Sequence, residues 1–227
     1  MKKIAVYFSG RCHGYELCLE KLSRHFYGKY DVDFFWSIDE ESETPYYAEF
    51  RRLLKPKGVY YEKVDKKIID VPISSLETRQ RNTLSMFFHN YHCGQMIMKY
   101  IEATGQQYHA VVRFRAEIDS DTDLVIDEKL LEHTVYIPHG YNYRGISDRI
   151  AYGTLSSMIV YSSLYVNIPN YVFAKQAIFN PEYLLMFHLN ENNMSVIRFP
   201  YHFTLHPGRH KVRASLVESQ DLSTSVE

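Results

Sequence analysis

The chain has 227 residues, of which 45% are hydrophobic and 23% are charged, and its formal net charge is −1. This composition is typical of one folded domain and excludes a chain that is disordered or of low complexity. The balanced charge, without a basic stripe, argues against a nucleic-acid partner.

The cysteines and the amino-terminal segment indicate the cellular compartment in which the protein is expected. Cys12, Cys18 and Cys93 form no CxxC pair, so we expect free thiols in a reducing compartment. The apolar run at residues 4–8 is too short for a signal peptide or a membrane span. We therefore expect a protein with no transmembrane segment that is cytoplasmic or peripheral to a membrane.

The first half of the chain alternates short apolar runs with helical patterns. Strands are expected at residues 3–8, 32–36 and 58–62, and helices at residues 15–26 and 45–54. This alternation is typical of βαβ units, so we predict an α/β fold with a central, mainly parallel, Rossmann-like sheet flanked by helices.

The longest expected helix covers residues 77–103, where apolar residues recur every three or four positions. Gly105 is a suitable carboxyl-terminal cap for it. A strand at residues 108–114 follows and runs into an acidic segment. Beyond that segment we expect a strand at 135–138, a strand-to-helix passage at 149–166, a helix at 181–189 and a returning strand at 196–199.

The acidic segment carries the strongest local signal. In extended backbone alternate side chains share a face, so Glu117, Asp119 and Asp121 are candidate ligands for Mg²⁺ or Mn²⁺. Such a cation neutralises the charge on a nucleoside diphosphate that leaves during glycosyl transfer, and Arg113 or Arg115 could assist. The alternative is a solvated turn and a helix start, where carboxylates are also common.

Two further segments are candidates for nucleotide binding. Ser9, Gly10 and Arg11 follow the first strand, where backbone amides and a cation can approach a phosphate. Asp39 follows the second strand and could bind the base or the ribose. An ordinary strand end and a solvated acidic turn remain the alternatives for these two segments.

Asp148 is the candidate catalytic base, because it follows a glycine-containing aromatic loop and precedes a buried strand. An inverting transferase needs one carboxylate to take the proton of the acceptor hydroxyl. Helix capping or loop pairing is the alternative for Asp148. Three histidines on a returning segment could lend an imidazole to the metal or the diphosphate, or be ordinary loop residues: His202, His206 and His210.

Three stretches together resemble a family of small glycosyltransferases with the GT-A fold, found in bacterial surface-polysaccharide synthesis and in large algal viruses. They are residues 5–11, residues 108–119, which resemble an R-x-R-x-D strand end, and residues 145–153, which resemble a G-x-N-D-x-F-A-x-G segment. Residues 180–185 also resemble the family's late helix. The chain departs from the pattern at Glu117, where Asp is usual, and at Ser147, where Asn is usual.

The resemblance implies a GT-A, or nucleotide-diphospho-sugar transferase, domain over residues 1–208. It implies a nucleotide-binding half at about 1–119 and an acceptor half at about 120–208, and we expect a flexible or ligand-ordered tail at 209–227. The expected reaction is metal-dependent and inverting transfer of a sugar, with a UDP-sugar favoured, to a hydroxyl of an oligosaccharide or glycoprotein. For a viral source the compartment would be the host cytoplasm.

Two other functions stay open. A metal-dependent phosphoryl or nucleotidyl transferase would also use clustered carboxylates on an α/β sheet, although the chain contains no Walker-type G-x-x-x-x-G-K loop. A noncatalytic sugar-binding module with the same fold would be compatible with Glu117 and Ser147.

Overall fold

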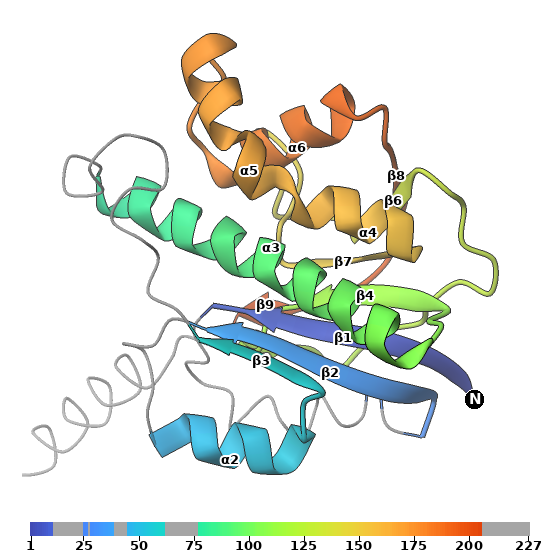
Figure 1. Ribbon diagram of the computed structural model, residues 1–227. Helices are drawn as coiled ribbons and strands as arrows, with labels where there is room; N and C mark the ends of the chain where they lie inside the picture. The colour runs from blue at the N-terminus through green and yellow to red at the C-terminus, as the bar shows by residue number, and fades with distance from the viewer. Residues whose placement is uncertain (11–24, 27, 39–44, 62–76, 206–227) are drawn as a thin grey trace, which may run out of the picture.

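The computed structural model describes residues 1–10, 25–26, 28–38, 45–61 and 77–205. A seven-stranded sheet with the order β3-β2-β1-β4-β7-β6-β8 forms its centre (Figure 1). Strand β7 is antiparallel to both β4 and β6, and the other neighbouring strands are parallel. This confirms the predicted α/β fold with a mainly parallel sheet. The strands are β1 (Lys2–Ser9), β2 (Tyr30–Ile38), β3 (Gly58–Tyr61), β4 (Ala110–Phe114), β6 (Thr134–Pro138), β7 (Ile150–Gly153) and β8 (Ser195–Phe199).

Helices cover both faces of this sheet. Figure 1 shows α2 on one side and α3, α4, α5 and α6 on the other. Among the described helices, none is long and apolar enough to cross a membrane. The helices are α2 (Pro45–Leu54), α3 (Thr78–Thr104), α4 (Leu155–Ser162), α5 (Leu164–Pro169), the π-helical turn η3 (Asn170–Ala174) and α6 (Pro181–Glu191).

The core lies in two layers because side chains of a strand alternate between the two faces. In β1, Ile4, Val6 and Phe8 belong to the layer on the α2 side, whereas Ala5 and Tyr7 belong to the layer under α3, α4 and α6. All five are at most 1% exposed. A strand buried on both faces reads as a continuous apolar run, and for this reason the sequence shows no alternation at residues 4–8.

The longest helix agrees with its sequence pattern. Helix α3 ends at Gly105, whose φ of 69° is left-handed and whose amide donates to the carbonyl of Ile101 at 2.8 Å. Its buried face includes Leu84, Phe87 and Ile97. This stripe of apolar residues at helical spacing stabilises the helix through packing on the sheet.

Two local features differ from the sequence pattern. The helical stretch expected within 149–166 is divided at Ser163, between α4 and α5, where the Ser163 hydroxyl donates to the Val160 carbonyl at 2.8 Å. Such a bond competes with the helical hydrogen-bond ladder. A small antiparallel sheet of β5 (Ile118–Asp119) and β9 (Thr204–Leu205) was not predicted, because two-residue strands have no readable periodicity.

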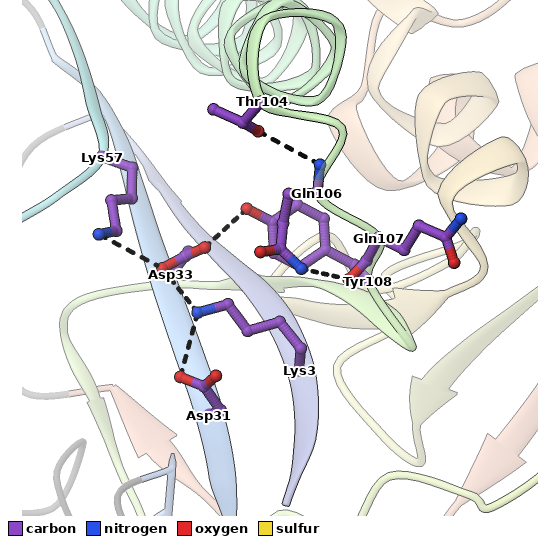
Figure 2. A network of polar contacts seen from close by, with 8 residues as sticks. All are labelled: Lys3, Asp31, Asp33, Lys57, Thr104, Gln106, Gln107 and Tyr108. Atoms are coloured by element: carbon purple, nitrogen blue, oxygen red, sulfur yellow. Dashed lines mark hydrogen bonds and ion pairs between the residues drawn. The ribbon is translucent and has the colours of Figure 1, made fainter.

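A polar network fixes the amino ends of the central strands (Figure 2). Its centre is Asp33, whose side chain is 3% exposed and accepts hydrogen bonds from Lys3 at 3.0 Å and from the Tyr108 hydroxyl at 2.9 Å. Lys57 lies 3.9 Å from the same carboxylate, and exposed Asp31 also pairs with Lys3. These contacts connect β1, β2, the segment before β3 and the segment before β4.

Candidate functional site

The candidate site lies at the opposite edge of the sheet, at the carboxyl ends of β1 and β4. From β1 the chain builds outward to β2 and β3 on one side, and β4 pairs with β1 on the other side. In open α/β sheets, ligands bind at such a reversal of strand order, outside the carboxyl ends of the strands. Ser9 is the last residue of β1, and Arg113 lies near the end of β4.

Arg113 is fully buried and connects three elements at this edge. One terminal nitrogen donates to the Asn90 side-chain oxygen on α3 at 2.7 Å and to the Ser9 hydroxyl. Its Nε donates to the backbone carbonyl of Asp148 at 2.5 Å, and its Nη2 lies 3.7 Å from the Asp148 carboxylate. Ser9 in turn donates to Asn90 at 2.6 Å. The structure thus connects Ser9, which was predicted to bind the nucleotide, with Asp148, the predicted catalytic base, through Arg113.

Arg115 lies beside this network and is 30% exposed. Its Nε donates to Glu117 at 2.7 Å, and its Nη1 lies 3.8 Å from the Asp148 carboxylate. Burial lowers the pKa of Arg115, but the charges of Glu117 and Asp148 outweigh burial and leave that pKa raised. Arg115 therefore keeps its positive charge between two carboxylates.

The acidic segment does not form a ready metal cluster in the described part of the chain. The described residues contain no group of three or more His, Cys, Asp or Glu side chains that could hold a metal ion. Glu117 is engaged by Arg115, and a turn at residues 116–117 interrupts the extended backbone before Asp119. These residues alone do not fit the cluster predicted for Glu117, Asp119 and Asp121, so metal binding stays a prediction.

The carboxyl-terminal segment returns to the acidic segment. Thr204 pairs with Asp119 in the β5–β9 sheet, and the Ser120 hydroxyl donates to the His202 carbonyl at 2.6 Å. The exposed His202 therefore lies next to the acidic segment through its backbone, and a role of its imidazole at a metal or diphosphate stays a prediction. Four other predicted residues lie outside the described residues: Arg11, Asp39, His206 and His210.

The end of β2 adds a buried pair that the sequence did not single out. The Ser37 hydroxyl lies 2.8 Å from Nδ1 of His89, and both residues are fully buried. Burial lowers the pKa of His89 to about 4, with a smaller contribution from His92. The amide of Gly10, whose φ is 82°, donates to the Ser37 carbonyl at 2.9 Å. This amide ties β1 to β2 and is not free for a phosphate in this structure.

Three buried polar side chains near Arg113 were also not identified from the sequence. Asn90, Tyr7 and Tyr161 are fully buried and lie on α3, β1 and α4, respectively. Burial raises the pKa of Tyr7 and of Tyr161, and the positive charge of Arg113 offsets only part of this rise. Asn90 could have been found as a polar residue within an otherwise apolar helical face. The two tyrosines look like core residues in the sequence, because only the fold brings them to Arg113.

The aromatic loop before Asp148, residues 140–147, is held by hydrogen bonds near both of its ends. The Tyr141 hydroxyl donates to the Phe203 carbonyl at 3.0 Å, and the Ile146 amide donates to the Glu182 carbonyl at 2.9 Å. The Arg149 guanidinium lies over the Tyr141 ring, 4.1 Å from its centre. The loop therefore closes one side of the site between the β5–β9 sheet and the start of α6.

The chain is similar to a solved glycosyltransferase structure, the apo form of GlyE of Streptococcus pneumoniae TIGR4. The TM-score is 0.51 at 12% sequence identity, and the match covers 87% of this chain and 45% of that one. No family model and no curated protein matches the chain. The chain thus spans less than half of GlyE. The likeness shows the fold, a GT-A-like, Rossmann-type α/β fold.

Proposed function

We propose that the protein is a glycosyltransferase that moves a sugar from a nucleoside-diphosphate sugar to a hydroxyl of a glycan acceptor. The observation that carries the proposal is the Arg113 network, which joins Ser9 on β1 to Asp148 before β7 at the carboxyl edge of the sheet. This edge is where a GT-A-like sheet offers a nucleotide site. The likeness to GlyE in fold, at 12% identity, is compatible with this class of reaction.

In the proposed reaction Asp148 accepts the proton of the acceptor hydroxyl as the hydroxyl oxygen attacks the anomeric carbon. The bond from that carbon to the diphosphate oxygen breaks, and the nucleoside diphosphate leaves with both bonding electrons. Direct displacement of this kind inverts the anomeric configuration. Arg115, which is part-exposed and keeps its charge, is suited to stabilise the departing diphosphate.

The finer assignments rest on the family resemblance. We favour a UDP-sugar as donor and an oligosaccharide or glycoprotein as acceptor. A bound Mn²⁺ or Mg²⁺ would neutralise diphosphate charge, with Asp119 as its first candidate ligand. The proton transfer is assigned to Asp148, and metal binding stays a prediction, because the described residues contain no group of three or more side chains that could hold a metal ion.

A ligand screen tests the proposal. Ligands that bind only the native state raise its melting temperature, so purified protein is heated with UDP-, GDP-, CMP- and dTDP-sugars, each with Mn²⁺ and with a chelator. Nucleotide release is then measured for each donor that binds. We expect a shift and nucleotide release with one nucleotide family. A shift without turnover would favour a noncatalytic sugar-binding module, and transfer of a phosphoryl or nucleotidyl group would favour the other enzyme class.

A further inference from the structure

Glu182, in the first turn of α6, is a buried carboxylate at the edge of the site. It is 7% exposed, and its Oε2 has no hydrogen-bond partner among the described residues. The aromatic loop packs tightly on it, because Gly145 leaves no room for a side chain against the Glu182 backbone. The proposed reaction does not use this carboxylate, although Asp148 lies close enough for its charge to raise the pKa of Glu182.

The charge of Glu182 is held at a cost in free energy. Burial has the largest effect and raises the pKa of Glu182. The hydrogen bond from its own backbone amide lowers this pKa, the charge of Asp148 raises it, and Arg149 and Arg79 lower it by smaller amounts. A glutamine of the same shape would avoid most of this cost. Packing alone therefore gives no reason for an ionisable group at this position.

We propose that Glu182 is a second functional carboxylate of the site, whose negative charge beside Asp148 stabilises the positive charge that develops on the transferred sugar. The inference rests on the proposed glycosyl transfer. As the bond to the diphosphate stretches, the sugar takes on oxocarbenium character. A carboxylate shielded from water acts on such a charge more strongly than an exposed one does.

The first arm of the test follows melting temperature from pH 4.5 to pH 8 in Glu182→Gln, Glu182→Asp and wild-type protein. A raised folded-state pKa means that wild-type protein loses stability as pH rises through that pKa. We therefore expect the melting temperature of Glu182→Gln to rise relative to wild type with pH, by about 2–4 °C. Glu191→Gln, on the same helix but part-exposed and paired with Lys175, should show no such trend.

The second arm measures nucleotide release from the donor that shifts the melting temperature in the ligand screen, with water or a glycan as acceptor. We expect kcat to fall at least tenfold in Glu182→Gln, with donor affinity within about twofold of wild type. Glu182→Asp, which keeps the charge, should retain more of the activity.

The outcomes separate the inference from the proposed function. A higher melting temperature with unchanged kcat would overturn the role of Glu182 while the transferase stands. A relative melting temperature that does not change with pH would show that the charge carries no cost, and would also overturn it. Wild-type protein that turns over no donor would remove the proposed function and this inference with it.

Discussion

Arg113 is the residue on which the candidate site depends most. A fully buried guanidinium is unfavourable unless its donors are satisfied and its charge is balanced. Here Asn90, Ser9 and the Asp148 backbone accept from it. Its Nη2 has no hydrogen-bond partner among the described residues, and the Asp148 carboxylate, 3.7 Å from this nitrogen, balances the charge. The sequence predicted that Arg113 and Asp148 belong to the site, but it gave no sign that one would hold the other.

Asp148→Asn tests the base at the level of a single residue. Asparagine keeps the shape but cannot take up the acceptor proton, so turnover should fall by roughly 10²–10⁴-fold. Donor affinity in the thermal-shift assay should stay close to wild type, because the donor does not depend on that proton transfer. Turnover near the wild-type level would remove Asp148 from the mechanism.

His89 gives a prediction about pH. Its folded-state pKa of about 4 lies below the ordinary value of 6.5, so the unfolded chain takes up a proton first as pH falls. The stability that depends on neutral His89 is present above pH 6.5 and is lost as pH falls towards 4, by about 3 kcal/mol at most. In His89→Gln this loss should be absent. Denaturant unfolding of both proteins from pH 7 to pH 4 measures the difference, and parallel curves would contradict the assignment.

At the scale of elements, the site depends on where β1 and β4 end and where α6 begins. Strands β1 and β4 place Ser9 and Arg113, and the start of α6 places Glu182. The strands and α6 were predicted from periodicity, because buried strands and helical faces leave clear apolar patterns. The division of the helical stretch at Ser163 and the two-residue strands β5 and β9 were not predicted. They depend on a local hydrogen bond and on pairing partners, which leave no apolar pattern in the sequence.

Gly145→Ala tests the contact between the aromatic loop and α6. A β-carbon at Gly145 would lie 2.0 Å from the Glu182 carbonyl oxygen, so loop and helix must separate. We expect a loss of about 1–3 kcal/mol in stability together with reduced turnover, measured by denaturant unfolding and nucleotide release. Gly94→Ala is the control, since its closest contact at 2.4 Å is the Ser162 hydroxyl, which can rotate away. Equal effects of the two substitutions would argue against a special role for the loop.

At the scale of the whole molecule, stabilising and candidate functional polar networks lie at opposite edges of one sheet. The Asp33 network fixes the amino ends of the strands (Figure 2), and the Arg113 network occupies the carboxyl ends. Parallel strands have all their amino ends at one edge of the sheet and all their carboxyl ends at the other. The residues of the two networks therefore do not contact each other. Substitutions at one edge should therefore leave the other unaffected.

Asp33→Asn tests this separation. The substitution removes the charge between Lys3 and Lys57 from a buried position, and it should cost about 1–3 kcal/mol of stability. Donor affinity should not change. Asp31→Asn is the matched control, because Asp31 is 58% exposed and pairs with the same Lys3. Weakened donor binding in folded Asp33→Asn protein would contradict the separation of the two edges.

The sequence by itself determined the α/β class, the mainly parallel sheet and most element positions, because these follow from apolar periodicity along the chain. It also marked Ser9, Arg113 and Arg115, where polar residues follow apolar runs at strand ends, and Asp148, which precedes a buried strand. Only the tertiary structure decided that Arg113 joins Ser9 to Asp148 and that Glu182 lies beside them. These contacts join residues up to 104 positions apart, and no local pattern records a partner that strand order alone brings near.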